Sequence, residues 1–254
     1  MKILLSWSSG KDSAWALHVL NVKRRGAVAG LLTTINESND RVAIRGVRRE
    51  VLEAQASAAG LPLRVATVPD QCPSAVYAAR MRDAFRAAAA DAFTHVAFGD
   101  LFLKDMRRYR EKLVADAGLT PLFPIWGIPT DRLAHDMISA GLKARVSCVD
   151  TRLIGPSFAG REFNATMLAD LPGGVDPCGE NGEFHTCVCD GPMFRGPVRL
   201  EVGRPERHEP FAWADLRLAG RPTAVRTGAS TTARPASAGS DSETRAWTSN
   251  AART

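Results

Sequence analysis

Short apolar runs alternate with longer amphipathic stretches along most of the chain. The short runs are rich in Val, Leu and Ile, which is typical of strands buried on both faces of a sheet. The longer stretches carry apolar residues at helical spacing, and several of them stop at a glycine. Strands are therefore predicted over residues 2–7, 28–35, 63–68, 95–98 and 143–149, and from residue 183 onward. Helices are predicted over residues 12–22, 47–59, 73–93, 104–117, 130–140 and 161–171.

This order of elements predicts an α/β fold with a doubly wound parallel sheet, because strands joined through helices form right-handed βαβ units. The sheet is expected in a nucleotide-binding domain over residues 1–127. Residues 128–219 become rich in glycine and proline from residue 172 and are expected to form a smaller mixed α/β domain. Residues 220–254 carry only two large apolar side chains, Val225 and Trp247, and are predicted to be a disordered tail.

The composition is ordinary for a globular protein, with 45% hydrophobic and 24% charged residues. No apolar run reaches the roughly 18 residues of a membrane span, and no signal-peptide cleavage site follows Lys2, so a membrane partner is not expected. The five cysteines are unevenly spaced, which favours a reducing cytoplasm over a disulfide framework. Half of the net charge of +6 lies in residues 220–254, so the body is too weakly basic to predict a nucleic-acid partner.

A serine- and glycine-rich loop, Ser6–Ser13, connects the first predicted strand to the first predicted helix. Its spelling is not that of a Walker loop, because Leu5 stands where that motif has its first glycine and Asp12 follows Lys11. It has one glycine, Gly10, whereas a dinucleotide-binding fingerprint needs three. Its place at a helix N-terminus still favours an anion, because backbone N–H groups and the helix dipole point there. A plain serine-glycine turn with an exposed lysine is the alternative.

The segment Val175–Thr186, VDPCGENGEFHT, concentrates groups capable of chemistry. Its prolines and glycines predict a turn, and a strand is expected from Glu183. Strand alternation would place one set of side chains in a site wall and the other in the core. The wall set is Glu183, His185, Cys187 and Cys189, and the core set is Phe184, Thr186 and Val188. A polar turn before an edge strand is the alternative.

A zinc site built from Cys178, His185, Cys187 and Cys189 is disfavoured by this spacing. Residues four apart on a strand are separated by roughly 13 Å. Zinc ligands must all lie within roughly 2.3 Å of one ion. His185 and Cys189 would therefore need a bulge between them to share a metal.

The two segments resemble motifs of known enzymes. Ser8–Ser13, SSGKDS, resembles the pyrophosphate loop SGGKDS of the N-type ATP pyrophosphatases, with Ser9 in place of the first glycine. The later segment, followed by the residues DGPMF, resembles the diphthine-ammonia ligase family, the amidating domain of diphthamide synthase. Residues matching its GEGGEYET-like motif are Glu180, Gly182, Glu183 and Thr186, whereas Asn181 and His185 depart from it in the manner of bacterial members. The segment Phe98-Gly99-Asp100, with Arg107 and Glu111 after it, resembles a further element of that family.

The resemblance implies that ATP adenylates a carboxylate, with AMP and pyrophosphate as products, and that ammonia then attacks the acyl carbon. ATP and Mg²⁺ are the implied cofactors. Implied nucleotide-binding residues are Ser6, Ser8, Ser9, Gly10, Lys11, Asp12, Ser13, Thr33, Thr34, Ile35, Gly99 and Asp100, of which Asp12 and Asp100 are the candidate metal ligands. Implied catalytic residues are Lys11, Glu180, Glu183 and His185. Implied substrate-binding residues are Arg107, Glu111, Cys178, Gly179, Asn181, Gly182 and Thr186.

Several alternatives remain open at this point. Arg107 and Glu111 are spaced as an ordinary surface ion pair on a helix. The enzyme could modify tRNA or a small metabolite, as other ATP pyrophosphatases do, or the chain could be an adenine-nucleotide sensor without turnover. The expected partners are ammonium and a carboxylate acceptor, either diphthine on elongation factor 2 or a bacterial equivalent, and a homodimer is left open.

Overall fold

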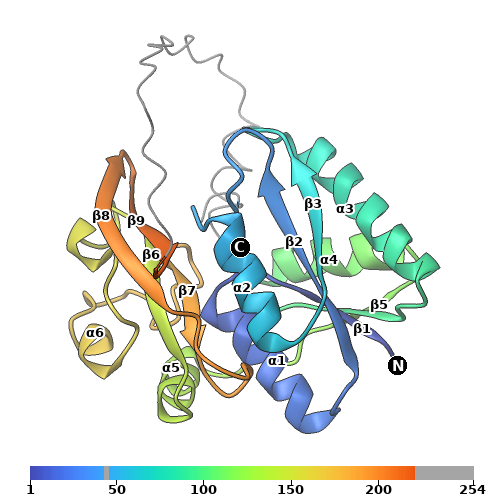
Figure 1. The fold of residues 1–254 in the computed structure, drawn as a ribbon, viewed down its shortest axis with the longest axis horizontal. Coiled ribbons are helices and arrows are strands. Elements are labelled where there is room, and N and C mark those ends of the chain that lie inside the picture. Colours follow the sequence, from blue (N-terminus) through green and yellow to red (C-terminus); the bar gives the residue numbers. More distant parts are fainter. Residues whose placement is uncertain (43–45, 221–254) are drawn as a thin grey trace.

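The computed structural model describes residues 1–42 and 46–220 (Figure 1). Two β-sheets lie side by side, with two helices between them. The disordered tail predicted from the sequence falls almost entirely on residues 221–254, outside the described residues. Within the described part, no helix is both long enough and apolar enough to cross a membrane.

The first sheet is parallel and has the strand order β3-β2-β1-β4-β5. This order is that of a doubly wound α/β fold, because the chain moves outward in one direction from β1 and then returns to build the other half. Its strands are β1 (Ile3–Ser6), β2 (Val28–Asn36), β3 (Leu63–Val68), β4 (His95–Ala97) and β5 (Thr120–Leu122). Its helices are α1 (Lys11–Lys23), α2 (Arg49–Ala59), α3 (Ser74–Ala90) and α4 (Lys104–Ala115).

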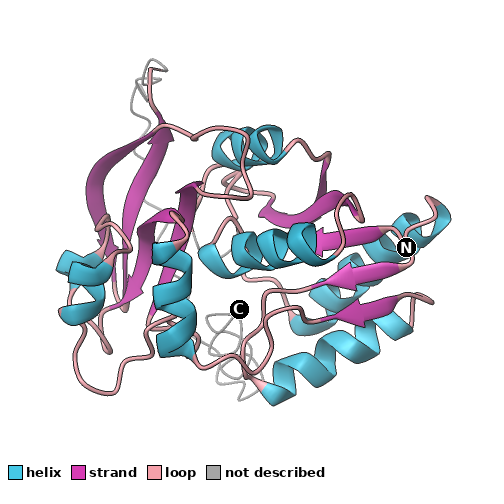
Figure 2. Ribbon diagram, turned by 90° about the horizontal axis from the view of Figure 1, so that it is seen from below, coloured by secondary structure: helices cyan, strands magenta, loops and turns pink. Residues whose placement is uncertain are grey.

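The alternation of β1 explains why helices cover both faces of this sheet. Ile3 and Leu5 point into one buried cluster with α1 and α2, whereas Leu4 points into another with α3 and α4. All three side chains are fully buried. Figure 2 shows the helices on either side of the strands. The parallel sheet predicted from the apolar runs is therefore confirmed, except that the short strand β5, which contains Pro121, was not predicted.

The second sheet is antiparallel and has the order β7-β6-β9-β8. Its strands are β6 (Lys143–Asp150), β7 (Phe184–Asp190), β8 (Leu200–His208) and β9 (Phe211–Leu218). Smaller helices accompany it, namely α5 (Thr130–Ser139), the 3-10 helix η1 (Pro156–Phe158) and α6 (Ala165–Ala169).

The helix predicted over residues 161–171 is wrong in its first third. Residues 160–163 run beside β6 instead, with Val146 N donating to Arg161 O and Phe163 N donating to Ala144 O. Only then does α6 begin, at the N-cap Asn164, whose side chain accepts a hydrogen bond from Met167 N. Backbone pairing with a neighbouring strand thus outweighs helix propensity in this segment.

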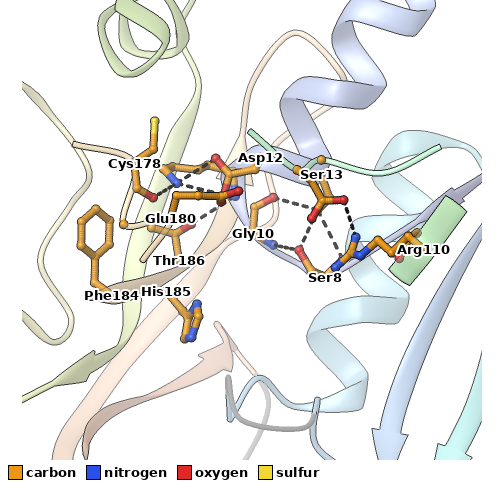
Figure 3. Close-up of a pocket in the computed structure, with 15 residues that line it drawn as sticks. Ser8, Gly10, Asp12, Ser13, Arg110, Cys178, Glu180, Phe184, His185 and Thr186 are labelled. Carbon is orange, nitrogen blue, oxygen red and sulfur yellow. Dashed lines mark hydrogen bonds and ion pairs between the residues drawn. The ribbon is translucent and has the colours of Figure 1, made fainter. Parts of the chain in front are cut away.

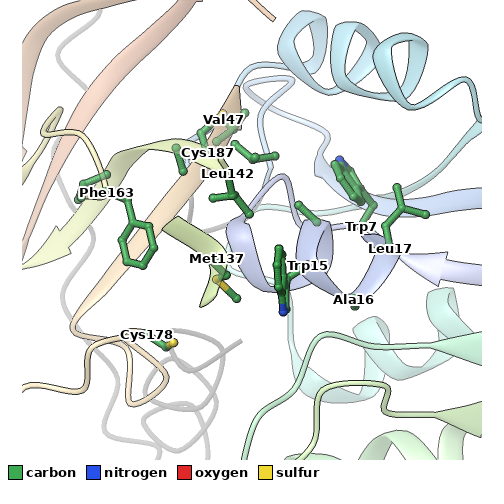
Figure 4. Close-up of a cluster of buried hydrophobic side chains, with 14 of the residues drawn as sticks. Trp7, Trp15, Ala16, Leu17, Val47, Met137, Leu142, Phe163, Cys178 and Cys187 are labelled. Atoms are coloured by element: carbon green, nitrogen blue, oxygen red, sulfur yellow. The ribbon is translucent and has the colours of Figure 1, made fainter. Parts of the chain in front are cut away.

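Helices α1 and α2 lie between the two sheets, where α1 contacts β7 and α2 contacts β9. One continuous apolar cluster joins the two halves (Figure 4). It includes Trp7 and Leu17 from the first half and Leu142, Phe163 and Cys187 from the second. The Ser6–Ser13 loop is therefore held between both sheets.

A buried carboxylate makes a second connection between the halves. Asp215 on β9 is 5% exposed and accepts hydrogen bonds from Arg41 and Arg48, which belong to the loop after β2, and from Arg217. Burial alone would raise the pKa of Asp215, but the three guanidinium groups hold it well below its usual range. The loop at the carboxyl end of β2 is thus fastened to the second sheet.

Candidate active site

A cavity opens at the carboxyl end of β1, where α1 begins and where β7 passes (Figure 3). Thirteen of the residues lining it were expected in a site: Ser6, Ser8, Gly10, Lys11, Asp12, Ser13, Gly99, Asp100, Cys178, Gly179, Glu180, His185 and Thr186. Arg110 and Phe184 also line it and were not expected there. The two sequence motifs, separated by some 165 residues, therefore meet in one place.

Ser9 has a left-handed backbone, with φ of 70°. Glycine adopts this conformation without steric cost, which accounts for a glycine at this position of the pyrophosphate loop. Ser9 is fully buried, and its contacts hold it in place. Its carbonyl accepts from Val188 N at 2.9 Å and from Gln55 Nε2 at 3.2 Å, and its hydroxyl donates to Cys187 Sγ at 3.2 Å.

Gln55 on α2 is a site-supporting residue that the sequence did not single out. Its side chain is fully buried and accepts a hydrogen bond from Trp7 Nε1 at 3.0 Å. Its amide nitrogen donates to Ser9 O and to Val188 O, the latter at 2.7 Å. One amide therefore links the end of β1, the loop and β7.

Lys11 is buried rather than exposed, so the plain serine-glycine turn with an exposed lysine is wrong. Its ammonium donates to both oxygens of Asp12, at 2.8 and 3.0 Å, and to Cys178 O at 2.5 Å. Its backbone N–H donates to Thr186 Oγ1 at 3.1 Å. Burial lowers the pKa of Lys11, but the Asp12 carboxylate, together with Cys178 and Glu180, outweighs this effect, so the pKa is raised and the group is a cation at neutral pH.

The hydroxyls of Ser8 and Ser13 shape the loop at the opposite side of the cavity. They lie 3.1 Å apart, and Ser13 Oγ donates to Gly10 O at 3.0 Å. Gly10 is the N-cap of α1 and supplies no side-chain cap. The first turn of α1 thus faces the cavity with backbone donors and small hydroxyls, the groups that favour a phosphate.

Gly99, just after β4, passes close to the start of α1. A Cβ atom at this position would lie 2.7 Å from both the carbonyl carbon of Asp12 and the nitrogen of Ser13. Real Cβ atoms do not approach backbone atoms this closely, so only glycine fits here. This close approach brings the next residue, Asp100, into the cavity wall, where its carboxylate pairs with Arg110 at 2.8 Å.

The acidic turn positions Glu180. Its backbone N–H donates to Asp176 Oδ2 at 2.8 Å, and its side chain accepts from Leu101 N at 2.9 Å. Burial, followed by the neighbouring charge of Asp12, raises the pKa of Glu180 to about 8. The Lys11 ammonium in the same cavity opposes this rise without cancelling it, so Glu180 favours its protonated form near neutral pH.

Glu183 does not lie in the cavity wall, contrary to the alternation argument. It is 4% exposed, and its Oε1 accepts from Asp176 N at 3.0 Å and from Asn181 Nδ2 at 3.1 Å. It therefore holds the turn that presents Glu180. Conversely, Phe184 and Thr186, assigned to the core, line the cavity. An extra residue in β6, opposite residues 185 and 186 of β7, forms a bulge that interrupts regular pairing at this point.

The other expected site residues lie outside the cavity lining. Asn181 is exposed, and Gly182 is buried within the turn. Thr33, Thr34 and Ile35 lie on β2, the neighbour of β1, and Thr33 Oγ1 is buried without a hydrogen-bond partner among the described residues. Arg107 and Glu111 form an ion pair of 2.7 Å along α4, as their spacing alone suggests.

The cysteines near the site, Cys178 and Cys187, are buried. Burial raises the pKa of Cys178 far above its usual range and that of Cys187 to about 12. Cys178 Sγ donates to Thr130 O at 3.4 Å. Over residues 1–42 and 46–220, no group of three or more His, Cys, Asp or Glu side chains is arranged to hold a metal ion.

Comparisons with known proteins match both halves of the chain. A family model described as the diphthamide synthase N-terminal domain matches residues 1–121, and one described as the diphthamide synthase C-terminal domain matches residues 129–218. A diphthine-ammonia ligase of Danio rerio is 31% identical over 121 residues, which are 45% of this chain and 47% of that protein. The match thus spans about half of that relative.

A solved structure, the U34-tRNA thiolase of Methanococcus maripaludis with its 4Fe-4S cluster, is similar over 55% of this chain and 56% of that one. Its sequence identity is 18% and its TM-score 0.36.

Proposed function

Because the chain belongs to the diphthamide synthase family, we propose that it is an ATP-dependent ligase. It forms AMP and pyrophosphate while it adenylates a carboxylate, and it then amidates that carboxylate with ammonia. The observation that carries the proposal is the meeting of Lys11 with the acidic turn. Its backbone contacts Thr186 and its ammonium contacts Cys178, so the loop and the second motif share one cavity.

The loop side of the cavity suits the phosphates of ATP. Lys11, the hydroxyls of Ser8 and Ser13, and the start of α1 would hold the β and γ phosphates and stabilise the charge that develops on the departing pyrophosphate. Asp100 and Gly99 would lie near the α phosphate. The adenine would lie against β2 near Thr33, whose buried hydroxyl has a hydrogen-bonding capacity that no described residue uses.

The carboxylates of Asp12 and Asp100 fit a magnesium ion. Both line the cavity, and Mg²⁺ in nucleotide sites is commonly held by one or two carboxylates together with substrate phosphates. Mg²⁺ bound there would neutralise phosphate charge. In the structure Asp12 pairs with Lys11 and Asp100 pairs with Arg110. Each of these carboxylates therefore already has a cation as its partner.

The opposite side of the cavity suits the amidation step. Glu180 has a partly buried carboxyl group whose raised pKa favours taking up a proton, and a cation beside it would favour its ionised form. We assign Glu180 to binding ammonium and accepting its proton as ammonia attacks. His185, which lines the same wall, is a second candidate for this base. Glu183 would act by holding the turn.

The acceptor is proposed from the Danio rerio relative, whose name specifies diphthine and ammonia. Diphthine on elongation factor 2 is one candidate, and a different carboxylate of bacterial origin is the other. Both require the same two half-reactions, so nucleotide products identify the reaction class before the acceptor is known.

The test is to incubate the protein with ATP, Mg²⁺, ammonium and a panel of carboxylates and to separate the nucleotides. We expect AMP and pyrophosphate, and formation of ADP instead would contradict the proposal. Lys11→Met should abolish AMP formation while its melting profile shows a folded protein. Lys23→Met, at the exposed C-terminal end of the same helix, is the matched control and should retain activity.

A further inference from the structure

The cavity holds two cations, and the proposed function uses only one of them. Lys11 pairs with Asp12 at 2.8 Å, and Arg110 pairs with Asp100 at 2.8 Å. All four side chains line the cavity. Figure 3 draws Arg110 beside Ser8 and Ser13, on the side opposite Cys178. The side where phosphate donors gather thus carries an arginine as well as a lysine.

Arg110 is held in a fixed plane. Its guanidinium carbon lies 4.7 Å from the centre of the Phe98 ring, and its side chain is 17% exposed. Phe98 is buried and directly precedes Gly99, so the ring belongs to the same rigid segment that forms the cavity wall. A guanidinium stacked on a ring keeps its N–H edges available for oxygen acceptors.

Anchoring of α4 does not account for the Asp100–Arg110 pair. The helix already buries Leu113 and Val114 in the apolar cluster on the outer face of the sheet. A partly buried ion pair loses hydration on both partners and stabilises a fold only weakly. Its place at the cavity wall therefore points to a ligand that makes use of one of the two charges.

Arg107 on the same helix provides a comparison. It also stacks on aromatic rings, at 4.8 Å from both Phe123 and Trp126, and it also pairs with a carboxylate, that of Glu111. However, neither Arg107 nor Glu111 lines the cavity. Two stacked and paired arginines, one turn apart, thus differ in whether they reach the site.

We propose that Arg110 is a phosphate ligand for the nucleotide and that Asp100 holds it in place until the nucleotide binds. The proposal rests on the function proposed above. The planar guanidinium donates two parallel hydrogen bonds to phosphate oxygens as readily as to a carboxylate. When a phosphate replaces Asp100 as the partner of Arg110, Asp100 becomes available as one of the two candidate metal ligands.

The test measures binding rather than turnover. Calorimetry with an ATP analogue that has a methylene bridge between its α and β phosphates, in the absence of divalent metal, gives the affinity of the phosphate chain. Adenosine is the phosphate-free probe. Arg110→Gln should weaken binding of the analogue by about tenfold or more and leave adenosine binding unchanged. Arg108→Gln, at an exposed position of the same helix, is the matched control and should leave the affinity for both probes unchanged.

A variant of the other partner, Asp100, should change the affinity for the analogue in the opposite direction. Asp100→Asn removes the partner that competes with phosphate, so it should strengthen binding of the analogue in the otherwise wild-type protein. If Asp100 acts through Arg110, the same change should give little gain in an Arg110→Gln background. This double-mutant cycle separates competition for Arg110 from a general loss of negative charge, which would strengthen binding equally in both backgrounds.

Each outcome bears on a distinct claim. If the wild-type protein binds the analogue and Arg110→Gln binds it equally well, the role of Arg110 is overturned while the proposed function stands. The role of Arg110 is also overturned if Arg110→Gln weakens adenosine binding as much as analogue binding. The same holds if Asp100→Asn strengthens analogue binding equally in both backgrounds. If the wild-type protein does not bind the analogue, the proposed function fails, and the role of Arg110 fails with it.

Discussion

At the scale of single residues, Ser9 combines an unfavourable backbone with a favourable set of contacts. A left-handed conformation costs a non-glycine residue on the order of 1 kcal/mol. The buried hydroxyl, in turn, donates to Cys187 and fills space beside β7. The contact of the hydroxyl therefore offsets, at the same residue, the backbone cost of a serine where the pyrophosphate loop has glycine.

This balance predicts the outcome of two substitutions at Ser9. Ser9→Gly relieves the backbone but loses the hydroxyl contact, so its melting temperature should stay within a few degrees of the wild-type value. Ser9→Val, which is β-branched and has no hydroxyl, should be destabilised by about 2 kcal/mol or more. Thermal unfolding of both variants checks the prediction. A Ser9→Val protein as stable as Ser9→Gly would show that the left-handed backbone is not a constraint.

The raised pKa of Glu180 predicts that the free energy of unfolding depends on pH. The carboxyl has a pKa of about 8 in the folded chain against an ordinary value of 4.5, so the folded state retains a proton that the unfolded state releases. The protonated Glu180 carboxyl contributes fully to the free energy of unfolding below about pH 4.5, and this contribution is lost as the pH rises through about 8. Glu180→Gln, which stays neutral, should therefore gain on the order of 4 kcal/mol relative to wild type between pH 5 and 9.

Urea unfolding at several pH values measures this difference. Glu53→Gln on the exposed side of α2 is the control, and its stability relative to wild type should not vary with pH. A difference between Glu180→Gln and wild type that is the same at pH 5 and at pH 9 would contradict a raised pKa at Glu180.

At the scale of elements, the contact between the end of β4 and the start of α1 fixes the cavity wall. Gly99→Ala would force a methyl group to within 2.7 Å of backbone atoms of Asp12 and Ser13. Backbone cannot move aside as a flexible side chain does, so we expect a loss of about 2 kcal/mol or more in stability and a larger loss of AMP formation.

Gly173→Ala is the matched control for this prediction. Apart from its chain neighbours, no described residue has an atom within 4 Å of a Cβ placed at Gly173, and the backbone of Gly173 is not left-handed. Its stability and activity should match wild type. If Gly99→Ala retained full activity, the wall formed by residues 99 and 100 would not need its close contact with α1.

The sequence predicts elements well where local patterns decide them. The buried strands β1 and β2 and the helices of the first half lie within three residues of their predicted bounds. It does not predict β8, which includes Gly203 and Pro205 and charged residues and depends on pairing with β9. Long-range pairing also explains the wrong helix before α6, because residues 160–163 find hydrogen-bond partners on β6.

The same distinction applies to the site. Lys11 and Glu180 belong to dense local motifs, and the sequence identifies them. Arg110 and Gln55 lie in ordinary helical patterns, and their roles depend on which elements the fold brings beside them. Glu183 was misplaced because strand alternation was counted from it, whereas β7 begins only at Phe184 and Glu183 still belongs to the turn.

At the scale of the whole molecule, the two sheets are separate in their strand pairing but share one apolar core. The boundary predicted near Gly127 separates the sheets, yet a single apolar cluster crosses it. Arg41 and Arg48, which pair with Asp215, and the amide of Gln55 add polar connections between the halves. We therefore expect one cooperative unfolding transition rather than two.

Gln55→Leu tests this coupling, because leucine matches its size and removes its hydrogen bonds. Trp7 Nε1, Ser9 O and Val188 O each lose a buried partner, and an unsatisfied buried polar group costs about 1–3 kcal/mol. We expect a loss of about 3 kcal/mol or more. Gln71→Leu, at an exposed position, should change stability little. A Gln55→Leu protein with unchanged stability would show that the loop and β7 are held together without this amide.

The single transition is tested on the wild-type protein. Unfolding curves followed by tryptophan fluorescence and by far-ultraviolet circular dichroism should coincide. Separate transitions would show that the two sheets fold independently.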